Sequence, residues 1–149
     1  MKINDIFEEL NLHFKRIDDI LPDIQEHIPL KEKDFKNKEL VAKIDSFIYR
    51  FIKIQDKMGE KLFPAYLKLL QEYKSGMPLL DVLNNLERIG VIERTEQWVE
   101  YRKLRNSLTH EYPGNMDEVI DALGLAFTAY GEMKKIYEYV IEQVHLRNF

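Results

Sequence analysis

One short segment of the chain combines residue types that suit phosphodiester chemistry. It reads Arg105-Asn106-Ser107-Leu108-Thr109-His110-Glu111-Tyr112. Arginine is always charged, and its planar guanidinium group suits phosphate oxygens. Histidine has an ordinary pKa that suits proton transfer near neutrality. Arg105 and His110 therefore offer a phosphate-binding group and a proton-transfer group five residues apart.

The spacing alone does not bring Arg105 and His110 together. On an ideal helix, five residues subtend about 140°, so these two side chains would point in different directions. Either the helix distorts at its end, or a cleft is assembled from two copies of the segment. From spacing alone a structural interpretation is favoured. In that interpretation Arg105 pairs with a surface glutamate, His110 is a polar residue at a helix end, and Tyr112 lies at the edge of the core.

Apolar residues recur at helical intervals through the first half of the chain. The first helix is expected from about Ile3, with a kink or break near residue 21 because Pro22 interrupts it. A second helix is expected from about Lys38 to Met58. A shorter continuation over residues 62–73 should follow at an angle, after breaks at Gly59 and Pro64. The segment 29–37 between the first two helices is expected to be a solvated loop.

The second half of the chain predicts three further helices. Pro78 suits the first position of a short helix that Gly90 would end. Thr95 can cap a helix that leads into the motif, and Asn115 can cap a last helix running to about Leu146. No strand-like alternation of useful length is present. We therefore expect one all-α domain over residues 1–149, an antiparallel up-and-down bundle of four to five helices with a kinked first and second helix.

Composition narrows the classes of function. The chain has 149 residues and no cysteine, and its four histidines show no metal-binding spacing. Its six glycines are scattered, so no phosphate-binding loop is expected. We therefore expect neither a metal nor a cofactor. No apolar run approaches the roughly 20 residues of a spanning helix, and no signal peptide is evident. We expect no membrane association and a cytoplasmic location, with which the absence of cysteine is compatible.

Charge is unevenly distributed along the chain. The formal net charge is −4, which argues against a general nucleic-acid coat protein. Residues 31–61 nevertheless carry nine basic and six acidic groups, and part of this charge forms a helical stripe of Lys43, Arg50, Lys57 and Lys61. The stripe would either steer RNA or form a solvated helix face. Arg102 would either extend the phosphate-binding group at Arg105 or pair with Glu96 or Glu100.

The motif resembles that of a known family. Its Arg and His match the R-x4-6-H motif of HEPN domains, and the full R-x4-H-x-Y form is similar to that of the HepT toxin group. Asn106 also fits that group, as does the segment 98–104 that precedes the motif. The segment 55–59 resembles one that recurs among closer relatives, but no role is assigned to it. The resemblance extends to most of the chain, although only about fifteen residues carry it specifically.

This resemblance implies a HEPN-like homodimer with both motifs facing a shared groove. It further implies a metal-independent endoribonuclease, the toxin of a toxin–antitoxin pair whose antitoxin is a nucleotidyltransferase. Arg105, His110 and Asn106 would be catalytic, leaving 2′,3′-cyclic phosphate and 5′-hydroxyl ends. Tyr112 would be the residue to which the partner attaches AMP. Arg102, Arg50 and Lys57 would contact RNA.

Two other functions remain open at this point. The chain would be a non-catalytic subunit of a minimal nucleotidyltransferase, using the motif to bind a nucleotide or the partner protein. Alternatively, it would be a purely structural helical dimer.

Overall fold

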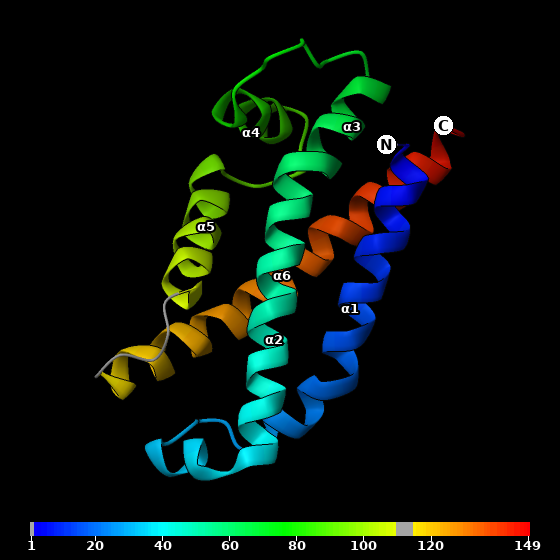
Figure 1. Cartoon of the computed structure of the whole chain (residues 1–149). Coiled ribbons are helices and arrows are strands. Elements are labelled where there is room, and N and C mark those ends of the chain that lie inside the picture. Colours follow the sequence, from blue (N-terminus) through cyan, green and yellow to red (C-terminus); the bar gives the residue numbers. More distant parts are fainter. Residues whose placement is uncertain (1, 110–114) are drawn as a thin grey trace.

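The computed structural model describes residues 2–109 and 115–149, and every regular element in this part of the chain is helical (Figure 1). The elements are α1 (Ile3–Gln25), a 3-10 turn (Glu32–Lys36), α2 (Lys38–Lys57), a π turn (Met58–Leu62), α3 (Phe63–Leu69), α4 (Leu79–Arg88), α5 (Thr95–Thr109) and α6 (Met116–Leu146). The predicted all-α class is confirmed.

Four long helices form the body of the molecule. In Figure 1, α1 and α2 run in opposite directions side by side, as do α5 and α6, and the two ends of the chain lie close together. The shorter α3 and α4 lie at one end, next to the start of α5. The antiparallel helical bundle is thus as expected from the sequence.

Irregularities occur close to the predicted positions but are milder than expected. Pro22 lies inside the last turns of α1, and the helix continues to Gln25, so of the two predicted outcomes near residue 21, a kink or a break, the break does not occur. Proline near a helix end removes one backbone hydrogen bond, which the rest of the helix tolerates. Gly59 does not interrupt the second helix either. Instead, α2 passes through the π turn into α3 without leaving helical geometry.

Local signals explain most helix ends. Asn37 and Asn115 cap α2 and α6, with their side chains accepting from the backbone N–H groups of Leu40 and Glu118. Gly90 ends α4 with φ of +82°, a conformation that glycine adopts without strain. The segment 29–37 is less open than expected, because it contains the 3-10 turn and buries Leu30.

Aromatic residues connect the helices at the centre of the bundle. Phe47 of α2 packs against Phe127 of α6, with ring centroids 4.8 Å apart. The Tyr137 hydroxyl of α6 donates to the Phe7 carbonyl of α1 at 2.9 Å, and burial raises the pKa of this tyrosine. Because a buried hydroxyl needs a partner, the hydrogen bond from Tyr137 helps to set the register between α1 and α6.

Candidate functional site

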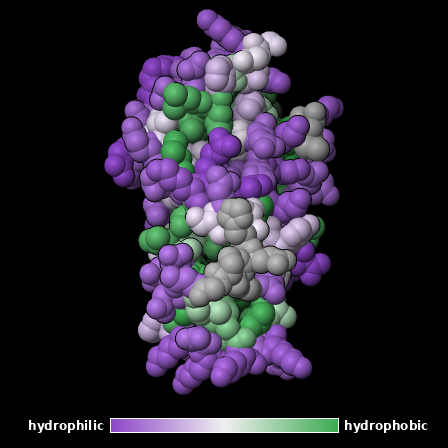
Figure 2. Space-filling view, turned by 60° about the vertical axis from the view of Figure 1, so that its left-hand side comes forward, coloured by the Kyte–Doolittle hydropathy of each residue, from purple (hydrophilic) through white to green (hydrophobic). Residues whose placement is uncertain are grey.

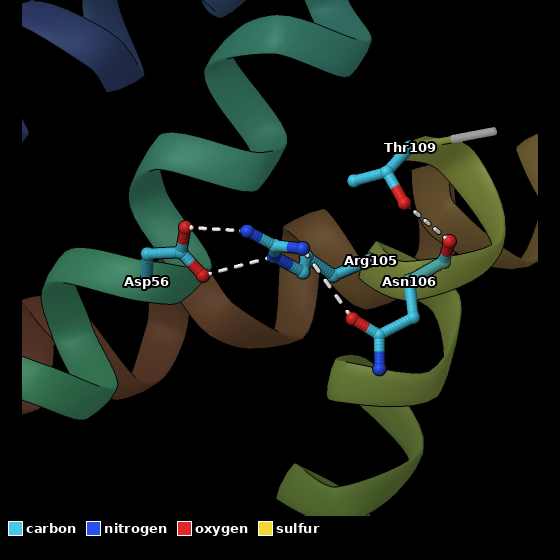
Figure 3. A network of polar contacts seen from close by, with 4 residues as sticks. All are labelled: Asp56, Arg105, Asn106 and Thr109. Atoms are coloured by element: carbon cyan, nitrogen blue, oxygen red, sulfur yellow. Dashed lines mark hydrogen bonds and ion pairs between the residues drawn. The ribbon is translucent and has the colours of Figure 1, made fainter. Parts of the chain in front are cut away.

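Arg105 lies on α5 and reaches across to α2, where it meets Asp56 (Figure 3). The contact is bidentate. Arg105 Nε donates to Asp56 Oδ1 at 3.0 Å and Nη2 donates to Oδ2 at 2.9 Å. These hydrogen bonds raise the pKa of the Arg105 guanidinium, so it stays charged. The expected surface glutamate partner is therefore wrong, since the partner is an aspartate on a neighbouring helix.

The local sequence explains why Arg105 takes this position. Trp98, Tyr101 and Leu108 are buried on one side of α5, whereas Arg102 and Asn106 are exposed. Arg105 lies between these two sides, and its side chain is 28% exposed. Trp98 is 1% exposed, so it belongs to the core and offers no surface on which a base could stack.

Asn106 adjoins the guanidinium group from the same helix. Its Oδ1 accepts a long hydrogen bond of 3.4 Å from Arg105 Nη1, and its carbonyl accepts from the Thr109 hydroxyl at 2.6 Å (Figure 3). Asn106 therefore lies where it can orient Arg105. His110 and Tyr112, the other two residues of the motif, lie outside the described residues.

A hydrogen-bonded chain lies behind Asp56. Gln55 is 2% exposed, and when its amide oxygen faces Trp98 it accepts from Trp98 Nε1 at 3.2 Å. In the same orientation its amide nitrogen donates to Asp56 Oδ1 at 3.3 Å. Gly59, in the π turn, lies beside the indole, and a Cβ there would be at ordinary contact distance, 3.4 Å from Trp98 Nε1.

Asp56 and Gln55 belong to the segment 55–59, for which the sequence suggested no role. The bidentate contact joins residues 49 positions apart, so spacing does not reveal it. The sequence offered only an acidic residue beside an amide, just before a glycine that predicted a helix irregularity. A π turn within an α-helix often marks a functional position.

The basic stripe of α2 mostly faces α1. Lys43 pairs with Asp23 at 2.6 Å, and Lys57 pairs with Glu9. Arg50 Nη1 lies 3.1 Å from His13 Nδ1, and burial together with Arg50 lowers the pKa of that histidine. Three of the four basic side chains of the stripe therefore contact residues of α1. RNA binding by Arg50 and Lys57 is not tested by these contacts and stays a prediction.

Arg102 is the more accessible cation near Arg105. It lies three residues earlier on α5 and is exposed. Within residues 2–109 and 115–149 it forms no ion pair, since Glu100 pairs with Lys103 at 3.1 Å instead. The alternative of a pair with Glu96 or Glu100 is therefore not observed, and an anion can reach Arg102.

The described part of the chain contains neither a metal-binding cluster nor a membrane-spanning helix. No group of three or more His, Asp or Glu side chains is placed to hold a metal ion. No described helix is long and apolar enough to cross a membrane. Comparison with known proteins adds no assignment, because no protein-family model, curated protein or solved structure matches the chain.

Proposed function

We propose that the chain is a HepT-like endoribonuclease of the HEPN class, the toxin of a toxin–antitoxin pair. The main support is the position of Arg105, five residues before His110. Its guanidinium group is held by Asp56 and adjoins Asn106. The helical bundle and the exposed Arg102 one turn away are in keeping with this function.

The proposed reaction uses the nucleophile that RNA itself carries. The 2′-hydroxyl oxygen attacks the adjacent phosphorus, and its proton passes to a base. The bond from phosphorus to the 5′-oxygen breaks, and that oxygen takes up a proton. His110 would carry out one of these proton transfers. Arg105 would stabilise the negative charge that builds up on the phosphoryl oxygens. The products are a 2′,3′-cyclic phosphate and a 5′-hydroxyl.

Chelation tests this proposal. The purified protein should cleave RNA in EDTA, because neither proposed chemical group is a metal ion. The rate should depend on a group that titrates near neutrality, as expected for His110. Activity that EDTA abolishes and magnesium restores would contradict the mechanism. RNA or nucleotide binding without cleavage would favour the non-catalytic nucleotidyltransferase subunit.

The proposed antitoxin provides a second test. A partner nucleotidyltransferase should attach AMP to Tyr112, two residues beyond His110, which would place a bulky anion beside the motif and repel RNA. Mass spectrometry after co-expression should find one adenylate on the peptide containing Tyr112, and none in a Tyr112→Phe variant. Adenylate on a different residue would refute this assignment.

We also propose that two copies of the chain form the enzyme, with both motifs in one groove. An apolar hollow of about 560 Å³ lies between the segment 28–30 and the first half of α6. Leu125, at its edge, is 61% exposed. On the face of the molecule drawn in Figure 2, most of the surface is hydrophilic, and hydrophobic residues form separate small areas. An exposed leucine beside an apolar hollow is typical of a protein contact.

Charge favours a second copy as the occupant of this hollow. Residues 31–38, which follow one wall, carry four lysines and two acidic residues. The start of α6, on the opposite side, carries Asp117, Glu118 and Asp121. A two-fold axis along the hollow would set the basic flank of one copy against the acidic flank of the other. The motif segment directly precedes α6, so this contact would also bring the two motifs closer.

A further inference from the structure

The contact with Asp56 uses only one edge of the Arg105 guanidinium group. Arginine has five N–H donors, and the edge formed by Nε and Nη2 faces the carboxylate. Among residues 2–109 and 115–149, the other edge, formed by Nη1 and the second N–H of Nη2, meets only Asn106, at 3.4 Å (Figure 3). Arg105 is thus held from one side and keeps donors for an anion on the other.

The hydrogen-bonded chain behind Asp56 restricts its own orientation. With the Gln55 amide oxygen facing Trp98, Asp56 Oδ1 accepts from both Arg105 and the Gln55 amide nitrogen, and Gln55 accepts from the buried indole of Trp98. Gln55 and Trp98 are 2% and 1% exposed, so neither is free to turn into solvent. These hydrogen bonds, which lead from the core to the guanidinium group, would already order the Arg105 side chain. Arg105 would therefore lose less side-chain entropy when it binds a phosphate.

We propose that Asp56, oriented by Gln55 and Trp98, is a positioning residue that turns the free edge of Arg105 toward the RNA phosphate. This inference rests on the proposed ribonuclease function. It assigns a role to Gln55 and Asp56 of the segment 55–59, which lie directly before the π turn. Asp56 does not touch the substrate, and it acts only through Arg105.

The Asp56 carboxylate has two opposing effects on an approaching phosphate, and a substitution of Asp56 can distinguish between them. It orients Arg105, which favours the transition state, but its negative charge repels RNA. Asp56→Asn keeps the size of the side chain and removes the charge. It should lower kcat by about 10- to 100-fold, the range expected for a misplaced catalytic group. KM should stay unchanged or fall.

Glu60 offers a matched control. It is an exposed carboxylate in the π turn that contributes to the field at Arg105 without a hydrogen bond to it. Glu60→Gln removes the same charge and should leave kcat unchanged. If kcat of Asp56→Asn equals that of the wild type, the positioning role is wrong while the ribonuclease function stands. A higher kcat/KM with unchanged kcat would make Asp56 a competitor of the phosphate and equally overturn the inference.

A second readout works without turnover. In NMR spectra, the Arg105 Nε–H signal of the wild type should be protected from exchange by the bond to Asp56, and Asp56→Asn should remove that protection. An RNA oligonucleotide with 2′-deoxy sugars, which cannot be cleaved by the proposed route, should shift the Arg105 signals of the wild type. Wild-type protein that fails to cleave RNA would refute the ribonuclease function. Arg105 signals that do not respond to the oligonucleotide would refute the positioning role itself.

Discussion

His110→Ala should lower the rate of RNA cleavage by about 10²–10⁴-fold, and Arg105→Ala should lower it by about 10²–10³-fold. The range for His110 is that of a lost acid–base group, and the range for Arg105 is that of a lost donor to a developing anion. Cleavage of a labelled RNA by the variants and the wild type gives the comparison.

Stability measurements separate this loss from unfolding. Arg105→Ala leaves Asp56 without its cation, but the two side chains are 28% and 33% exposed. An ion pair of this exposure is worth roughly 0–1 kcal/mol. For a chain of this size that corresponds to a fall in Tm of at most about 4 °C. A large rate loss with so small a change in Tm indicates a direct role in the reaction.

Arg105→Lys is the sharper control. Lysine keeps the positive charge but has no planar fork, so it cannot bind Asp56 through one edge and a phosphate through the other. The variant should cleave RNA almost as poorly as Arg105→Ala. Wild-type cleavage by Arg105→Lys would show that charge alone suffices, and the assigned role of Arg105 would then be wrong.

Leu125→Glu should convert the proposed dimer into a monomer. The glutamate would place a charge in the apolar hollow and beside the acidic start of the same helix, and an unpaired charge in such a contact is costly. Light scattering should give twice the chain mass of 17.9 kDa for the wild type and the single mass for the variant. We expect the dimer to weaken by at least about 100-fold.

Leu80→Glu is the matched control for this substitution. Leu80 lies on α4, away from the hollow, and is 56% exposed. The Leu80→Glu variant should have the same mass in light scattering as the wild type. A wild type that is monomeric at all concentrations would contradict the dimer. A dimer that Leu125→Glu does not affect would place the contact on another face.

The sequence predicted the helices well because their signals are local. The cap at Asn115 and the turn at Gly90 both follow from residues within a few positions of one another. Arg105 could be singled out for the same reason, since its motif is contiguous.

The environment of Arg105 could not be predicted, because it depends on how α2 packs against α5. The contacts of the basic stripe were missed for a different reason. Residues 1–30 carry seven acidic and three basic groups, and their charge complements the basic segment 31–61. This signal was in the sequence and pointed to packing of α1 on α2.

Analysis of the RNA ends tests the central claim most directly. Wild-type protein is incubated with an RNA oligonucleotide, and the cleavage position and product masses are determined by mass spectrometry. The same oligonucleotide with a single 2′-deoxy sugar at that position is the control. We predict 2′,3′-cyclic phosphate and 5′-hydroxyl ends, and no cleavage at the deoxy position. Products with 3′-hydroxyl and 5′-phosphate ends, or equal cleavage of both oligonucleotides, would contradict the account.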